Sequence, residues 1–109
     1  MREFNYLNQK TQILSCDENL IVKELNKSKN YYLIDQKVSE LYPDFINRLP
    51  QKLGLCLIEA KEVNKSLTQV KIIVEDLLAK KITKASTIVA IGGGIICDLA
   101  GFIASTYKR

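Results

Sequence analysis

The sequence predicts a single α/β domain, built on a mostly parallel sheet with flanking helices. Three observations predict this class. The chain has 109 residues, which is enough for about one hydrophobic core. Short apolar runs alternate along it with stretches of helical periodicity, the pattern of βαβ units. One of those runs ends in three consecutive glycines, at the end of a strand where ligands of such sheets bind.

Five segments are predicted to be strands. Three of them, residues 31–34, 53–58 and 87–91, are short and nearly continuous apolar runs. Such runs are typical of strands that are covered on both faces, as in a parallel sheet. Two further strands are predicted near the N-terminus, over residues 4–7 and 12–15.

Helical periodicity occupies the segments between the strands. Asp17 and Ser66 are suitable N-caps for two helices, the second of which runs to about Lys81. Between residues 38 and 49, apolar side chains repeat every three or four positions on one helix face. Pro43 interrupts this repeat, so the helix is either kinked there or begins again at Pro43.

Two details of these helices are further expectations. A last helix is expected to begin near Cys97 or Asp98 and to run toward the chain end. The inward stripe of the helix after Ser66 is expected to consist of Leu67, Val70, Val74, Leu77 and Leu78.

Composition and charge exclude several classes of function. Hydrophobic residues make up 47% and charged residues 26%, and no apolar run is long enough to span a membrane. The first twenty residues lack an apolar signal core, so we expect a cytoplasmic protein without a membrane partner. The net charge of +4 comes from lysines dispersed among acids, so no nucleic-acid partner is expected. Three widely spaced cysteines and no histidine predict that the chain binds no metal.

The glycine triplet is the strongest candidate for a binding element. Gly92, Gly93 and Gly94 follow an apolar run and lead almost at once into the last helix. Because glycine has no Cβ, the amides here can approach a ligand closely, and a helix N-terminus favours an anion. A diphosphate has the matching charge. The alternative is a tight strand-to-helix turn that binds nothing.

Two other polar stretches follow strands of the same predicted sheet. Asp35 ends the run YYLID, where a carboxylate can chelate a ribose diol or cap the next helix. Glu62 and Lys65 precede the Ser66 cap, where they can bracket ribose hydroxyls and an amide or form a surface ion pair. Parallel strands share one carboxyl edge, so we expect these stretches and the glycines to converge.

The glycine segment resembles the signature of the 3-dehydroquinate synthase family, which belongs to the sugar-phosphate cyclases. The family pattern has three glycines, two aliphatic residues, Gly-Asp and then Gly-Phe, with Tyr and Arg downstream. This sequence reads GGGIICDLAGF, followed by Tyr107 and Arg109. Glu62-x-x-Lys65 resembles the family's Glu-x-x-Lys-Ser motif, and Asp35 resembles its ribose-binding aspartate. The resemblance covers most of the chain from residue 30 onward.

The resemblance implies that residues 1–109 form the Rossmann-like, NAD-binding N-terminal domain of a two-domain lyase. In the shikimate pathway this enzyme converts a phosphorylated seven-carbon keto-sugar acid, DAHP, into 3-dehydroquinate and phosphate. Arg109 is implied to contact the substrate, and Asp98 is implied to lie near the nicotinamide. The implied cofactor-binding residues are Asp35, Glu62, Val63, Asn64, Lys65, Gly92, Gly93, Gly94, Ile95, Ile96, Cys97 and Asp98.

The resemblance also implies what these 109 residues lack. The family's divalent metal, zinc or cobalt, is held by one Glu and two His of a C-terminal domain that is absent here. No catalytic residue is therefore assigned, and we expect the chain to be inactive by itself. Three residues depart from the family pattern: Cys97 and Lys61 replace glycines, and Lys37 replaces an asparagine.

Two rival functions stay open. The chain could belong to another sugar-phosphate cyclase of the same superfamily, because the residues that select the substrate lie downstream. It could also be a non-catalytic nucleotide-binding module. We further expect exposed apolar surface where a second domain would pack, which would favour self-association, for instance as a homodimer.

Overall fold

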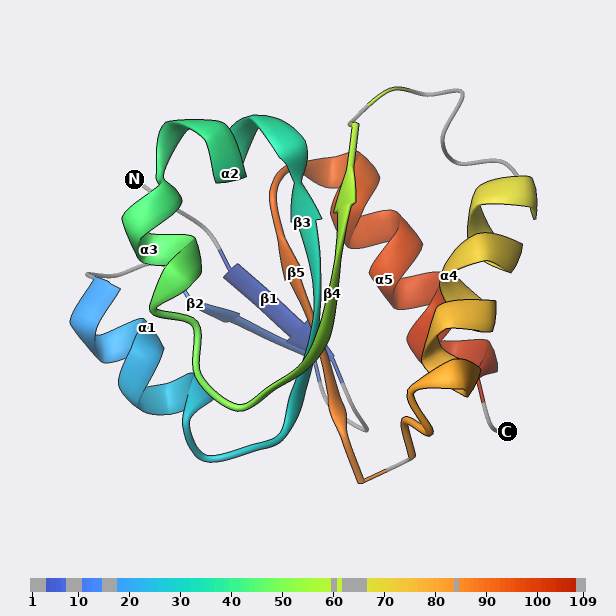
Figure 1. The fold of residues 1–109 in the computed structure, drawn as a ribbon, viewed down its shortest axis with the longest axis horizontal. Coiled ribbons are helices and arrows are strands. Elements are labelled where there is room, and N and C mark those ends of the chain that lie inside the picture. The colour runs from blue at the N-terminus through green and yellow to red at the C-terminus, as the bar shows by residue number, and fades with distance from the viewer. Residues whose placement is uncertain are drawn as a thin grey trace.

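The computed structural model describes residues 4–7, 11–14, 18–59, 61, 67–83 and 85–107 (Figure 1). The described strands are β1 (Phe4–Leu7), β2 (Thr11–Leu14), β3 (Asn30–Asp35), β4 (Lys52–Ile58) and β5 (Thr87–Ile91). The described helices are α1 (Glu18–Leu25), α2 (Gln36–Leu41), α3 (Pro43–Asn47), α4 (Leu67–Ala79) and α5 (Gly94–Thr106).

The strands form one sheet in the order β2-β1-β5-β3-β4. β3 lies between β5 and β4 and pairs parallel with both. β1 pairs antiparallel with β2 and with β5. The prediction of an α/β domain with a parallel sheet and flanking helices is therefore confirmed for β3, β4 and β5, and the two short N-terminal strands add an antiparallel hairpin.

The sheet separates two hydrophobic layers. Figure 1 shows α1, α2 and α3 on one face of the sheet and α4 and α5 on the other. Because successive side chains of a strand point to opposite faces, β3 serves both layers. Tyr31 and Leu33 pack with the residues of α4 and α5, whereas Tyr32 and Ile34 pack with those of α1 and α3. All four side chains are fully buried, which confirms the prediction of a strand covered on both faces.

β4 differs from that prediction because it is an edge strand. Among the described strands it pairs with β3 alone, and Leu57 in its second half is 47% exposed. Its register also shifts, since Asn30 pairs with Lys52 but Tyr31 pairs with Gly54, which leaves Leu53 as an extra residue. A continuous apolar run therefore does not distinguish an edge strand from a central one.

Pro43 resolves the question of the interrupted helix. α2 ends at Leu41, and α3 begins with Pro43 as its first residue, where the missing N–H costs no hydrogen bond. The restart lets Phe45 and Ile46 reach the core, and Leu49 after α3 is buried with them. Leu41, which the periodicity placed on the same face, is 70% exposed instead.

α4 presents a different face from the one expected. Ile73 and Leu77 are its buried residues, and Val70 packs against the core beside them. Leu67 and Leu78 were expected to point inward, but they are 79% and 53% exposed. The expected stripe is therefore wrong at both ends, because the buried face is centred on Ile73.

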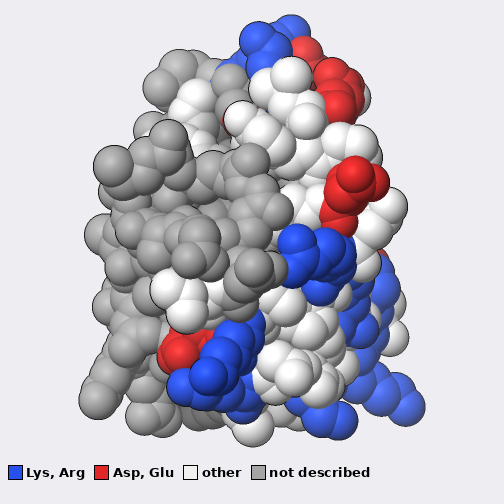
Figure 2. Space-filling view, turned by 90° about the vertical axis from the view of Figure 1, so that its left-hand side faces the viewer, with Lys and Arg blue, Asp and Glu red and all other residues white. Residues whose placement is uncertain are grey.

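The face covered by α1, α2 and α3 carries charges of both signs. Figure 2 shows lysine and arginine side chains spread over the described part of this face, with acidic side chains between them. Lys27, for example, pairs with Glu24 at 2.9 Å.

Among the described residues, no helix is long and apolar enough to cross a bilayer.

Candidate functional site

The carboxyl ends of the three parallel strands meet at one edge of the sheet, as expected. Ile34 of β3 pairs with Ile91 of β5, so the next residues, Asp35 and Gly92, are neighbours across the strands. Asp35 is also in register with Ile58, the last residue of β4. The topology therefore brings two of the three candidate stretches into direct proximity.

Gly92 occupies a position that only glycine fits well. Its φ is +152°, a backbone conformation that residues with a Cβ rarely adopt. A Cβ built on Gly92 would lie 2.9 Å from the Cβ of Asp35 and 3.0 Å from Cγ1 of Ile96. Both contacts are far inside the normal separation, so the absent side chain of Gly92 lets β3 and α5 approach each other here.

Gly93 and Gly94 have no comparable structural requirement. Within the described part of the chain, a Cβ on either residue would meet no atom within 4 Å. Gly93 has extended backbone angles, φ −88° and ψ −161°, that other residues adopt. Both residues are exposed, and the space over them is open. The fold explains the first glycine of the triplet, whereas the other two border a space that a ligand can enter.

α5 begins at this turn and directs its N-terminus into the same space. Gly93 is the N-cap, with no side-chain hydrogen bond to cap the helix, and its carbonyl accepts from the amide of Cys97 at 3.1 Å. In an α-helix the first amides have no partner inside the helix, and its dipole places positive charge there. The turn therefore offers amide donors and a favourable field to an anion.

The expected start of the last helix was wrong by about one turn. α5 begins at Gly94 rather than at Cys97 or Asp98, because glycine serves as the cap. Asp98 consequently lies beyond the first turn, where its side chain is exposed. Ile96 is fully buried in the core, so only its backbone can face a ligand, while Ile95 and Cys97 are half-buried.

Asp35 is the N-cap of α2. Its Oδ1 accepts a hydrogen bond from the amide of Lys37 at 3.0 Å, and its backbone is extended, φ −60° and ψ 125°. The sequence left open whether Asp35 caps the next helix, and in the structure it does. The cap uses one carboxylate oxygen and keeps the group beside Gly92, so capping leaves the second oxygen for another donor.

Several predicted site residues lie outside the described residues. They are Glu62, Val63, Asn64 and Lys65 of the second stretch, the Ser66 cap, and Arg109. The last described residue before the stretch, Lys61, pairs its ammonium with Glu59 at 2.7 Å. α4 begins directly after the stretch, at Leu67.

The described residues contain no group of three or more His, Cys, Asp or Glu that could hold a metal ion. Neither Cys56 nor Cys97 forms a disulfide within the described residues. These residues therefore do not fit a zinc or cobalt centre, and no step of a metal-dependent reaction can be built on them.

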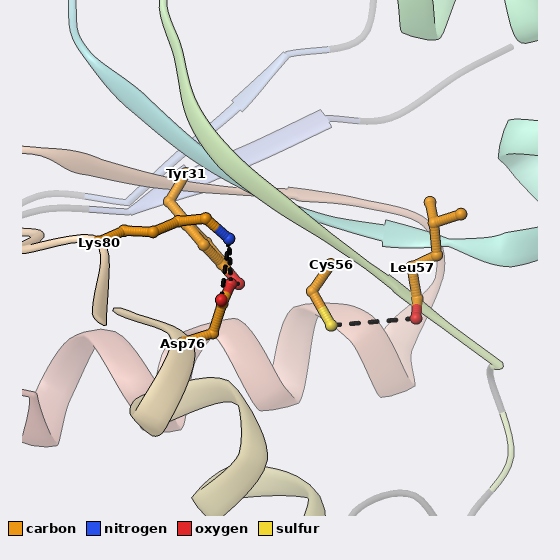
Figure 3. A network of polar contacts seen from close by, with 5 residues as sticks. All are labelled: Tyr31, Cys56, Leu57, Asp76 and Lys80. Atoms are coloured by element: carbon orange, nitrogen blue, oxygen red, sulfur yellow. Dashed lines mark hydrogen bonds and ion pairs between the residues drawn. The ribbon is translucent and has the colours of Figure 1, made fainter. Parts of the chain in front are cut away.

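A polar cluster between β3 and α4, on the face of the sheet covered by α4 and α5, was not predicted from the sequence. The Tyr31 hydroxyl donates to Oδ2 of Asp76 at 2.5 Å, and Nζ of Lys80 lies 2.8 Å from both oxygens of that carboxylate (Figure 3). Cys56 lies beside it on β4. The spacing of Asp76 and Lys80 indicates a helical ion pair, but 45 residues separate Tyr31 from Asp76, and no local pattern links them.

The cluster shifts the titration of its members. The hydrogen bonds from Lys80 and then Tyr31 lower the pKa of Asp76 below its ordinary 3.8. Burial, followed by the hydrogen bond to Asp76, raises the pKa of Tyr31 far above its ordinary 10.0. Burial and the Asp76 charge also raise the pKa of Cys56. At neutral pH the carboxylate is therefore ionised, while the phenol and the thiol keep their protons.

The fold and the edge described above define a Rossmann-like α/β unit, with two exposed glycines at a strand-to-helix turn beside a carboxylate. The model of the 3-dehydroquinate synthase N-terminal family matches residues 55–109. The chain therefore belongs to the 3-dehydroquinate synthase family.

Individual relatives agree with this assignment. The 3-dehydroquinate synthase of Staphylococcus epidermidis is 38% identical over 86 residues, which are 77% of this chain and 24% of that protein. The one from Streptococcus mutans is 38% identical over 93 residues, 81% and 26% of the two chains. The 2-epi-valiolone synthase of Stigmatella aurantiaca is 33% identical over 81 residues, 71% and 20%. The chain spans about a quarter of the length of the curated relatives it matches.

The three glycines are predicted to respond differently to the same substitution. Gly92→Ala should lower the free energy of unfolding by about 2 kcal/mol or more, because it adds backbone strain and two close contacts. Gly93→Ala and Gly94→Ala should change it by less than about 1 kcal/mol. Urea titrations of the three variants measure the difference, and equal effects at all three positions would contradict the geometry.

The Asp76 cluster predicts a pH-dependent contribution to stability. The folded pKa of Asp76 is lowered, so its stabilising effect is complete well above the ordinary value of 3.8 and disappears as the pH falls through the folded value. The stability difference between the parent and Asp76→Asn should therefore be large at pH 7 and shrink below about pH 4. Urea titrations across this range test it. Glu75→Gln, in the exposed 3.9 Å pair with Lys71, serves as the control with little effect.

Proposed function

We propose that this chain is the NAD-binding N-terminal domain of a 3-dehydroquinate synthase. The observation that carries the proposal is the open space over Gly93 and Gly94, next to the carboxylate of Asp35 and at the N-terminus of α5. A dinucleotide has a diphosphate for the amides of the turn and ribose diols for a carboxylate. Because the chain belongs to the 3-dehydroquinate synthase family, we propose that this dinucleotide is NAD.

Each part of the proposed site has a distinct role. The backbone of residues 93–96 binds the diphosphate, because its amides are the unpaired donors of α5. Asp35 accepts hydrogen bonds from a ribose diol while it caps α2. Glu62, Val63, Asn64 and Lys65, which precede α4 in the sequence, complete the proposed site, and Asp98 faces the nicotinamide in it. Arg109 contacts the phosphorylated sugar-acid substrate.

The reaction belongs to the whole protein. The relatives' names support a synthase that makes 3-dehydroquinate, and the sequence resemblance suggests that it is a lyase that eliminates phosphate. When bound, NAD supplies the temporary oxidation of a substrate hydroxyl that such an elimination requires. The residues of this chain bind and orient the dinucleotide beside the substrate. The described residues contain no group that fits the family's divalent metal, and we expect these 109 residues alone to be inactive and cytoplasmic.

A different sugar-phosphate cyclase activity is the second candidate function, and one comparison favours it. The relative from Stigmatella aurantiaca is named 2-epi-valiolone synthase, and it is 33% identical over 71% of this chain. The N-terminal domain is thus similar in proteins that are named for different products. Steady-state assays of the longer protein with each cyclase substrate separate the two activities.

Two substitutions, Asp35→Asn and Gly93→Ala, are predicted to weaken NAD binding. Asp35→Asn keeps an oxygen for the Lys37 amide, and asparagine caps helices as well as aspartate does, so the fold is retained. It removes the charge that a ribose diol prefers, and NAD affinity should fall about 10-fold or more. Gly93→Ala should weaken binding by a similar factor, because its methyl group enters the open space. Calorimetry or NMR titration up to millimolar NAD measures both.

The control is Asp44→Asn, an acidic residue in the first turn of α3. It changes the same charge by the same chemistry at a different helix start, and NAD affinity should not change. If Asp35→Asn and Gly93→Ala bind NAD as tightly as the parent chain, the site is placed incorrectly.

A further inference from the structure

Lys37 is a cationic residue whose backbone is tied to the carboxylate of the proposed site. Its amide donates to Oδ1 of Asp35 at 3.0 Å, so the base of its side chain lies next to that carboxylate. Figure 1 shows α2, which contains Lys37, beginning directly after β3, at the end of the sheet where α5 begins after β5. The flexible four-carbon stem of a lysine is long enough for its ammonium to reach a group bound to the Asp35 carboxylate.

The Lys37 ammonium has no charge partner in the described part of the chain. Its side chain is exposed, and none of the ion pairs between described residues includes it. Glu40, one helical turn further along α2, accepts a hydrogen bond at 3.4 Å from the side-chain amide of Gln36 instead. The ammonium is therefore available to an anion from solution.

Asp35 by itself favours a dinucleotide whose ribose is not phosphorylated. A carboxylate accepts hydrogen bonds from the hydroxyls of a ribose diol. The cap to the Lys37 amide and the close approach of Gly92 hold this carboxylate in place. A phosphate on the 2′ oxygen of that ribose would meet a fixed negative charge, and like charges repel strongly at short distance. The carboxylate alone would therefore exclude a 2′-phosphorylated dinucleotide.

Lys37 supplies the positive charge that offsets this repulsion. In dinucleotide-binding folds, a cationic side chain near the ribose accommodates a 2′-phosphate. An ammonium binds phosphate as a compact point charge on a mobile stem. Lysine stands here where the family pattern has an asparagine, so the added charge is a departure of this chain. A carboxylate with an unpaired ammonium beside it suits both forms of the ribose.

We propose that Lys37 is a specificity-determining residue that lets the site bind NADP, the 2′-phosphorylated form of NAD, as well as NAD itself. The ammonium pairs with the 2′-phosphate when NADP binds, and Asp35 accepts hydrogen bonds from the free diol when NAD binds. Both forms place their diphosphate at the same glycine turn. The proposal rests on the proposed function, since it assigns a ribose of the dinucleotide to Asp35.

Calorimetric titrations of the parent chain and of Lys37→Gln with NAD and with NADP test this role. Glutamine removes the charge, and the cap of α2 is retained because it uses the backbone amide. The parent chain should bind NADP within about 10-fold of NAD. Lys37→Gln should lower NADP affinity about 5-fold or more at low salt, and NAD affinity should stay within about 2-fold. Lys23→Gln, at an exposed lysine of α1, is the matched control and should change neither affinity.

The ratio of the two affinities separates this inference from the proposed function. Asp35→Asn should shift the ratio in the opposite direction, toward NADP, because it removes the repelling charge. A parent chain that binds NAD but binds NADP more than about 10-fold more weakly would overturn the inference alone. Equal losses of NAD and NADP affinity in Lys37→Gln, or no loss of either, would also overturn it. A parent chain that binds neither nucleotide would refute the proposed function, and the inference with it.

Discussion

Parallel pairing of β3 between β5 and β4 is the constraint on which the site depends. It aligns Asp35 with the residue that follows β5, and the two strands can meet there only because Gly92 has no side chain. The same strand supplies buried residues to both layers, so its register is fixed by the core on each face. The geometry of the binding edge is therefore a consequence of core packing rather than of loop conformation.

The glycine triplet combines two different requirements in three adjacent residues. Gly92 is needed by the fold, since its backbone angle and its neighbours leave no room for a Cβ. Gly93 and Gly94 face open space, and no contact with the described residues requires their side chains to be absent. A residue identity that the fold does not explain is best explained by what binds there. Under the proposed function, the space over these two residues is where the nucleotide binds.

The sequence predicted the parts of the molecule that local patterns determine. Continuous apolar runs located β3 and β5, and the rule for proline at the first helical position identified the restart at Pro43. The start of α5 was misjudged because glycine is a poor helix former yet acts as the cap at Gly93. The edge position of β4 and the contact between Tyr31 and Asp76 depend on which elements become neighbours, which the spacing of residues along the chain does not encode.

α5 directs its first amides toward the edge where Asp35 and the glycine turn meet. The central claim is that a dinucleotide occupies the edge where Asp35 meets the glycine turn. Amide chemical shifts recorded during an NAD titration test it most directly. The account predicts that the largest changes fall on residues 35–37 and 92–97. Changes confined to the opposite edge of the sheet, around Lys29 and Gln51, would contradict it.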